Sequence, residues 1–187
     1  MNCPRDLTAH GASPALDPRD KSVRLLGRAR DKSRVAAKEG LMLEPAIEIL
    51  DSHRQMAIST VRPDGWPQTT IVGYANDGWM VYFLIFRDSQ KFANIAADDR
   101  VSIAISGESS SLGEIKAVFA GAHAGEVKDP QERERAWELL IGRHPNLGEF
   151  GLPDNSATAL MRAACKYVSI VDYSKGIGHT EALTVAA

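Results

Sequence analysis

Six runs of apolar and β-branched residues follow one another along the chain and predict six strands. They cover residues 56–61, 69–75, 79–86, 101–106, 115–127 and 166–171. Arg62-Pro63-Asp64-Gly65 and Asn76-Asp77-Gly78 lie between the first three runs. Both segments suit tight turns, because proline fixes φ and glycine accepts a positive φ. The fifth run contains Gly121 and Gly125, where we expect a kink.

Helical periodicity is weaker and lies between these runs. Pro45 is placed to begin a helix that ends near His53 or Arg54, and Pro130 to begin another with a buried face. A short amphipathic helix is expected over residues 89–98, and Asp154-Asn155-Ser156 suits the cap of a further helix reaching Ala164.

Tight hairpins between most of the strands favour an antiparallel sheet. Six such strands in about 120 residues suit a small closed barrel, which leaves no strand edge exposed. We therefore expect a mainly β fold, a six-stranded antiparallel barrel with helices that plug or flank it.

Residues 1–40 differ from the rest of the chain. Prolines are frequent in residues 1–20, and residues 19–39 hold eight basic against three acidic side chains. A solvated helix or tail explains this run better than a nucleic-acid site. We expect a variable, partly disordered or basic-helical extension over 1–40, and a barrel domain with a C-terminal tail over 41–187.

Composition excludes several classes of partner and site. Of the 187 residues 44% are hydrophobic and 25% are charged, and the net charge of −2 gives no general attraction to nucleic acid or to an anionic membrane. Two cysteines cannot form a disulfide framework. Residues 1–20 lack the apolar segment of a secretory signal, and no apolar run has membrane-spanning length. A cytoplasmic location is expected.

Motifs of common enzyme classes are missing. Residues 107–111 lack the second glycine of a nucleophile elbow, and Gly176-Ile177-Gly178 lacks the third glycine of a dinucleotide-binding loop. The histidines are too scattered for a metal-ligand cluster, so no metal site is expected; they are His10, His53, His123, His144 and His179.

Asp88-Ser89-Gln90-Lys91 is the most informative segment, because it joins a predicted strand to the start of a predicted helix. Unpaired N–H groups and the helix dipole favour an anion there, and Ser89 and Lys91 add a hydroxyl and a positive charge. A phosphate site is one interpretation. The other is that Asp88 or Ser89 caps the helix while Lys91 lies in water.

The order of these segments resembles a known family. Residues 56–68, with their Asp-Gly-x-Pro turn, are similar to the opening strand and turn of the pyridoxamine 5'-phosphate oxidase-like, FMN-binding split-barrel proteins. The resemblance continues through 69–74, Met80 to Phe83, the Ser-x-Lys step and 98–103. It covers residues 43–127, and 166–172 less closely.

This resemblance implies a split barrel that forms a homodimer, with FMN in the crevice between two chains. Ser89 and Lys91 would bind the FMN phosphate. Residues that would run beside the flavin ring and ribityl chain are Gln68, Thr69, Thr70, Ile71 and Val72. On propensity alone, a plain β-branched strand is the preferred interpretation of the last four.

The sequence departs from the true oxidases at three places. Gln68 and Tyr74 occupy the approximate positions of an arginine and a lysine that reach the phosphate, and Arg87 is a candidate to replace one lost charge. The C-terminal motif that binds pyridoxal phosphate in the true oxidases is absent, and residues 172–179 stand in its place. Vitamin B6 synthesis is therefore not expected.

The resemblance favours an FMN-dependent oxidoreductase with an unknown substrate, and whether a deazaflavin replaces FMN stays open. The alternative is a non-enzymatic flavin- or haem-binding protein, in which His123, His179 or Tyr173 would be the axial ligand. Residues 174–180 are interpreted either as a solvent loop or as a flap over the flavin crevice, with Lys175 or His179 close to the cofactor.

Overall fold

The computed structural model describes residues 44–150 and 156–185. The predicted extension over 1–40 and the proposed capping residues Asp154 and Asn155 lie outside these ranges.

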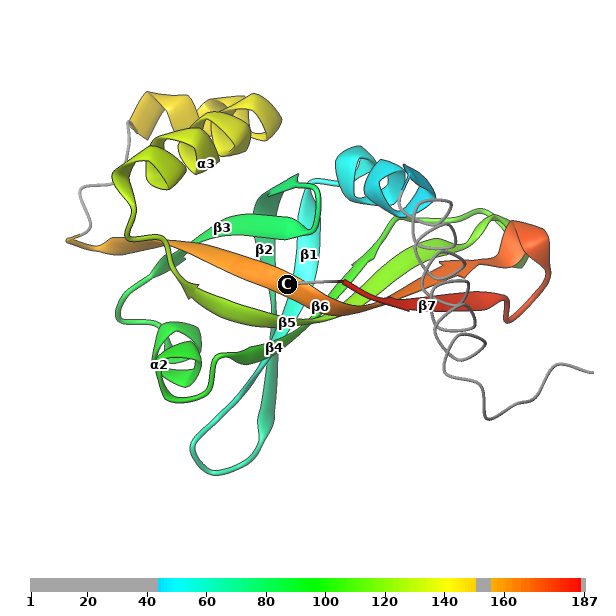
Figure 1. Cartoon of the computed structure of the whole chain (residues 1–187), viewed down its shortest axis with the longest axis horizontal. Helices are drawn as coiled ribbons and strands as arrows, with labels where there is room; N and C mark the ends of the chain where they lie inside the picture. The colour runs from blue at the N-terminus through cyan, green and yellow to red at the C-terminus, as the bar shows by residue number, and fades with distance from the viewer. Residues whose placement is uncertain (1–43, 151–155, 186–187) are drawn as a thin grey trace, which may run out of the picture. The chain divides into compact units, whose positions relative to one another are not determined.

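Six antiparallel strands close into a barrel (Figure 1). Hydrogen bonding joins them in the order β3-β2-β1-β4-β5-β6, and a further pairing of β3 with β6 closes the ring. The strands are β1 (Gln55–Val61), β2 (Pro67–Asp77), β3 (Met80–Phe86), β4 (Arg100–Ser106), β5 (Lys116–Glu126) and β6 (Thr158–Asp172). The predicted six-stranded antiparallel barrel is confirmed.

Turn chemistry and alternation explain the hairpins. In β1 every second residue from Met56 to Thr60 is buried, as a strand with one face toward a core requires. Gly65 and Gly78 have φ of 87° and 57°, which favours glycine at both turns. The kink expected in the fifth strand is a register shift of the β5–β6 ladder at Gly121/Ala122.

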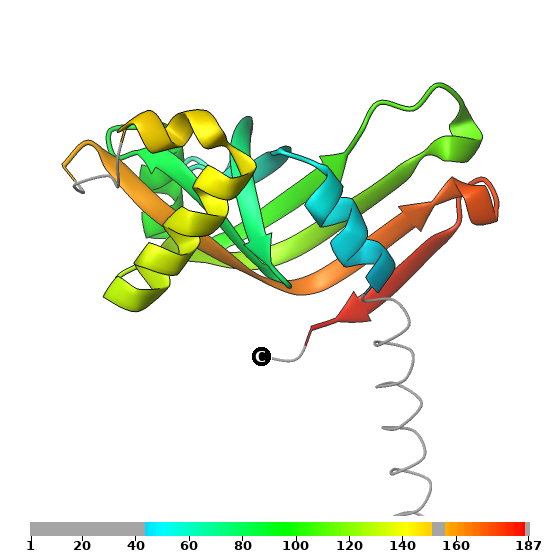
Figure 2. The same ribbon diagram turned by 90° about the horizontal axis from the view of Figure 1, so that it is seen from above.

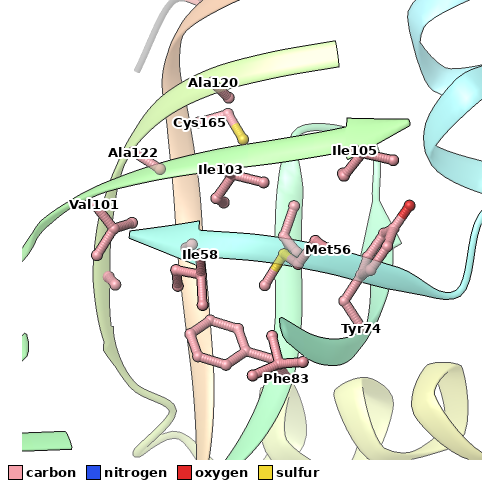
Figure 3. Packing of buried hydrophobic residues seen from close by; sticks show 14 of the residues in the cluster. Met56, Ile58, Tyr74, Phe83, Val101, Ile103, Ile105, Ala120, Ala122 and Cys165 are labelled. Carbon is pink, nitrogen blue, oxygen red and sulfur yellow. The ribbon is translucent and has the colours of Figure 1, made fainter. Parts of the chain in front are cut away.

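Side chains fill the inside of the barrel (Figure 3). Met56 and Ile58 from β1 meet Phe83 from β3 there, each with at most 1% of its surface exposed. Cys165 is buried in the same cluster, and burial raises the pKa of its thiol to about 12, so it behaves as a core residue. A filled interior leaves the outside of the barrel for any large ligand.

Three helices flank the barrel in the described ranges. One covers residues 44–52, the second is α2 (Gln90–Ala97), and the third is α3 (Pro130–Arg143). A second apolar cluster forms where α3 packs on the outside of the sheet; it contains Ala75, Tyr82, Val127, Ala136, Leu140 and Leu160. Short 3₁₀ helices η1 (Leu112–Glu114), η2 (Pro145–Phe150) and η3 (Tyr173–Lys175) connect the other elements.

The helix predicted to end at Ala164 is wrong. That segment is the first half of β6, which pairs with β3 on one side and β5 on the other. Alanine, leucine and methionine favour a helix in isolation, but Ala159, Leu160 and Met161 are buried in succession because α3 covers the outside of the barrel here. Tertiary packing therefore overrides local preference.

A seventh strand, β7 (Thr180–Thr184), lies outside the closed ring and was not predicted. It pairs with the second half of β6 through a hairpin whose tip is η3 (Figure 2). Leu183 and Val185 pack against the barrel core from this added strand. Part of the predicted tail is thus integrated into the sheet.

No helix within residues 44–150 or 156–185 has the length and hydropathy needed to cross a membrane.

Candidate functional site

The segment singled out from the sequence forms the N-terminus of α2. Ser89 is the N-cap: its hydroxyl donates to the Phe86 carbonyl at 2.6 Å and accepts from the Phe92 N–H at 3.3 Å. No acceptor within the described ranges pairs with the backbone N–H groups of Gln90 and Lys91. Two donors at the positive end of the helix dipole therefore stay available to a ligand.

Lys91 is the second residue of α2 and is only partly exposed. It makes no hydrogen bond or ion pair with another residue that the structure describes, and burial lowers the pKa of its amine. The first turn of α2 contains no acidic residue. A cation is unfavourable at this end of a helix, so Lys91 occupies a position that becomes favourable when an anion binds beside it.

Arg87 precedes the same helix but is already neutralised. Its guanidinium forms an ion pair with Glu126 at the end of β5 and lies 5.3 Å above the centre of the Phe92 ring. Replacement of a lost phosphate-binding charge by Arg87 would require it to give up Glu126. Lys91, rather than Arg87, is the cation at this end of the barrel that lacks an acidic partner within the described ranges.

Gln68 is fixed against α2 by a buried amide. Asn94 donates at 2.9 Å to both the Thr60 hydroxyl and the Gln68 side-chain oxygen, and Gln90 donates to Asn94 at 2.9 Å. Asn94 is completely buried. This network joins β1, β2 and α2, so Gln68 and the helix N-terminus keep a fixed relation to each other.

The rest of the predicted flavin strand alternates between two faces. Thr70 and Val72 point inward, and the Thr70 hydroxyl is a buried polar atom without a hydrogen-bond partner within the described ranges. Thr69 and Ile71 point outward; Thr69 bonds the Ser59 hydroxyl at 2.8 Å, and Ile71 is 64% exposed. An unpaired buried hydroxyl is uncommon and is consistent with a water or ligand partner.

The two predicted residues of the tail lie elsewhere. Lys175 and His179 both bond one oxygen of Glu181, at 3.1 and 2.8 Å. Their hairpin and α2 lie toward opposite ends of the barrel domain in both views (Figures 1 and 2). One chain therefore does not bring Lys175 and His179 to Lys91.

Tyr74 does not take the place of the lysine found in the true oxidases. Its side chain is inside the barrel, where the hydroxyl donates to the Leu50 carbonyl at 2.6 Å. Burial raises its pKa to about 12, so it stays neutral. The second strand thus contributes no charge to the candidate phosphate site.

Two histidines are held by carboxylates. His123, on the outer face of β5, bonds Asp99 through Nδ1 at 3.0 Å, and His179 bonds Glu181 through Nε2. Within the described ranges, however, no group of three or more histidine, cysteine, aspartate and glutamate side chains is placed to hold a metal ion.

Comparison with known families identifies the barrel. Residues 42–172 match the family model described as pyridoxamine 5'-phosphate oxidase. The chain belongs to this family. The resemblance drawn from residues 56–103 is thereby confirmed, although the match does not test any individual site residue. No curated protein matches the sequence.

Several solved structures share the fold at low identity. A haem-binding protein from Mycobacterium smegmatis is 20% identical, with a TM-score of 0.63; the match covers 73% of this chain and 55% of that one. A FAD-binding protein from Mesorhizobium loti is 17% identical, with a TM-score of 0.55 and coverage of 67% and 91%. A putative pyridoxamine 5'-phosphate oxidase from Listeria innocua is also 17% identical, with a TM-score of 0.57 and coverage of 70% and 98%.

Asn94 was not predicted as a residue of the site. It lies between Ala93 and Ile95 in an amphipathic helix, and an asparagine beside apolar neighbours is the signal that could have pointed to it. Its partners Thr60 and Gln68 come from other elements, so only the structure identifies the network.

Proposed function

We propose that this protein is an FMN-binding flavoprotein whose cofactor phosphate is held at the N-terminus of α2, and that it is an oxidoreductase with an unassigned substrate. Lys91 is the observation that best supports this. It is partly buried, has no acidic partner within the described ranges, and lies where the helix dipole disfavours a cation. A bound phosphate would give the Lys91 amine a negatively charged partner and would offset the unfavourable position of a cation at this end of the helix.

The surrounding groups fit a flavin. Free N–H groups of Gln90 and Lys91 suit phosphate oxygens. Gln68, fixed by Asn94, would contact the cofactor from β2. A bound flavin supplies hydride chemistry itself, so the protein's part is to bind and orient it.

A homodimer forms the second part of the proposal. The filled interior excludes the flavin, so the cofactor needs a crevice outside the barrel. One outer face has an apolar row in which Ile71, Ala57, Ala104 and Phe119 are successive partners across β2, β1, β4 and β5. Ile71 and Phe119 are 64% and 44% exposed. Pairing of this face with a second copy would cover both residues and form two equivalent crevices.

In such a dimer the C-terminal hairpin of one chain would lie near the flavin crevice of the other. The hairpin of Lys175 and His179 lies at the other end of the barrel domain from its own α2. In the proposed dimer these two residues would approach the crevice of the partner subunit. Sedimentation tests the assembly. We expect a dimer with an interface above ~2,000 Å², and dissociation in Phe119→Asp but not in Leu112→Asp, which changes an exposed residue of η1. A monomeric wild-type protein with FMN bound would contradict the dimer.

Haem binding is the second candidate function, and the His123–Asp99 pair favours it. Histidines that ligate metals commonly donate their other ring N–H to a carboxylate. Asp99 bonds Nδ1 of His123, and the His123 side chain is 50% exposed. His179 has the same kind of support from Glu181, with Nδ1 left over, whereas no hydrogen bond orients the Tyr173 hydroxyl within the described ranges.

Absorption spectroscopy separates the two candidates. The full-length protein would be incubated with FMN or haem, freed of unbound ligand and scanned. A retained flavin double band supports the first proposal. A Soret band that is lost in His123→Ala, with no retained flavin, supports haem binding. Retention of neither ligand would contradict both.

A further inference from the structure

A cavity lies on the outside of the barrel, under α3 and η2. It has a volume of about 250 Å³, and its lining residues are Gly73, Leu84, Leu140, His144, Asn146 and Leu147. None of them belongs to the proposed flavin site. In Figures 1 and 2 the yellow helices α3 and η2 lie over the outside of the sheet at this place. The inference drawn from this cavity does not depend on flavin binding.

Several contacts fix the polar wall of the cavity. The His144 N–H donates to the Leu140 carbonyl at 2.7 Å, and the ring nitrogen Nε2 donates to the Tyr74 carbonyl at 3.0 Å. The imidazole also packs on the bare backbone of Gly73, where an added Cβ would lie 3.2 Å from its Cε1 atom. Gly73 and His144 are therefore matched in shape.

This arrangement determines what the ring offers to a ligand. A carbonyl only accepts, so Nε2 must hold the proton, and Nδ1 of the neutral ring is an acceptor. No partner for Nδ1 or for the Asn146 amide exists within residues 44–150 and 156–185. The residues that line the cavity thus include a histidine with an unused acceptor and an asparagine with an unused donor and acceptor, beside three leucines.

The lining also limits ligand size and charge. A cavity of roughly 150 Å³ holds benzene, so this one has room for a substituted single ring. Among the residues that the structure describes, no lysine, arginine or acidic side chain lines it. Arg143 precedes His144, but its guanidinium is bonded to the Leu50 carbonyl at 2.8 Å and to Asn76 at 2.7 Å. A charged ligand would therefore lose hydration without gaining a counter-ion.

From this shape and chemistry we propose that the cavity under α3 and η2 binds a small uncharged aromatic molecule with a hydrogen-bond donor beside an acceptor, as in an aromatic carboxamide. The amide N–H donates to Nδ1 of His144, and the carbonyl accepts from Asn146. The leucine side chains cover the ring.

Benzamide and benzoate form a matched pair of probes, because they share a ring and differ in charge and in donor capacity. Each would be titrated into the ¹⁵N-labelled full chain, with the amide signals of Gly73, Leu84 and Leu147 as the readout. Benzamide should shift these signals and bind at least about tenfold more tightly than benzoate. Equal affinities, or no shifts with benzamide, would overturn the proposal without any variant being needed.

Two variants locate the site. His144→Phe keeps a ring beside Gly73 but removes the acceptor, and should weaken benzamide binding by about five- to tenfold. Leu147→Trp fills the cavity and should abolish binding, whereas Leu112→Trp on η1, far from the cavity, should not. Unchanged affinity in Leu147→Trp would place benzamide elsewhere and reject the assignment. Because the flavin residues are separate, loss of FMN binding would not affect this result.

Discussion

The basic side chains of two helices on the same barrel lie in opposite environments, paired at α3 and, among the residues that the structure describes, unpaired at α2. On and around α3 the arginines are paired: Arg135 with Asp77, Arg162 with Glu132, and Arg143 with Asp51 and Asn76. The first turn of α2 has Lys91, with no partner within the described ranges and with a lowered pKa. Paired charges fix α3 to the sheet. An unpaired, partly buried one adds nothing to the fold, and we propose that a bound ligand accounts for it.

The largest expected effect tests the structural side of this contrast. Arg143 is 16% exposed and donates to the Leu50 and His53 carbonyls as well as to Asn76, so Arg143→Met leaves several acceptors unpaired. Denaturant unfolding should show a loss of about 2–4 kcal/mol. Arg135→Met on the same helix removes only an exposed pair and should cost less than about 0.5 kcal/mol. Equal losses would show that α3 is not held through Arg143.

A smaller loss of stability is expected for a substitution at the start of α2. Ser89→Ala removes the hydroxyl that accepts from the Phe92 N–H, so the free energy of unfolding should fall by about 1 kcal/mol. FMN affinity should change less than it does in Lys91 variants, because the backbone donors remain. Ser109→Ala, in the exposed loop between β4 and η1, is the matched control and should leave the midpoint of unfolding unchanged.

Substitution of Lys91 should raise the free energy of unfolding, whereas substitution of Ser89 should lower it. In the protein without ligand, Lys91→Glu replaces a cation by an anion at the positive end of α2, so stability should rise by about 0.3–1 kcal/mol, with Lys91→Gln between the two. Thermal unfolding measures this. A destabilised Lys91→Gln variant would mean that the lysine has a structural partner, and would remove the main argument for a ligand.

The smallest effect concerns the other end of α2. Arg100 donates to Asp98, the C-cap residue, and lowers the pKa of its carboxyl to about 2. This lies below the ordinary value of 3.8, so the contribution to stability is complete above about pH 4 and is lost as the pH falls toward 2. Carboxyl NMR should show the pKa of Asp98 moving up toward 3.8 in Arg100→Ala. An unchanged titration would mean that backbone contacts alone depress it.

Most of the barrel could be predicted because its signals are local. Alternation in 56–61 and the turn glycines Gly65 and Gly78 depend on neighbouring residues only. The first half of β6 could not be predicted, since Ala159 to Met161 form a strand only because β3, β5 and α3 surround them. Local preference there points to the wrong structure.

In the candidate site, too, the features with a local signal could be predicted and those that depend on distant contacts could not. Lys91 was found from the Ser-x-Lys step, a local pattern. That Arg87 is neutralised by Glu126, and that Gln68 is fixed by Asn94, depends on contacts between residues 39 and 26 positions apart. The hairpin with Lys175 and His179 lies at the other end of the barrel domain, which no spacing in the sequence indicates.

Comparison of FMN with riboflavin tests the central claim most directly, because the two ligands differ only in the phosphate. Both would be titrated into the wild-type protein and into Lys91→Ala, with Lys128→Ala, an exposed lysine beyond β5, as the control. We expect FMN to bind more tightly than riboflavin in the wild type and in the control. In Lys91→Ala, FMN should lose about 1.5–3 kcal/mol while riboflavin is unchanged. If the preference for FMN is the same in all three proteins, the phosphate is not held by Lys91 at the N-terminus of α2.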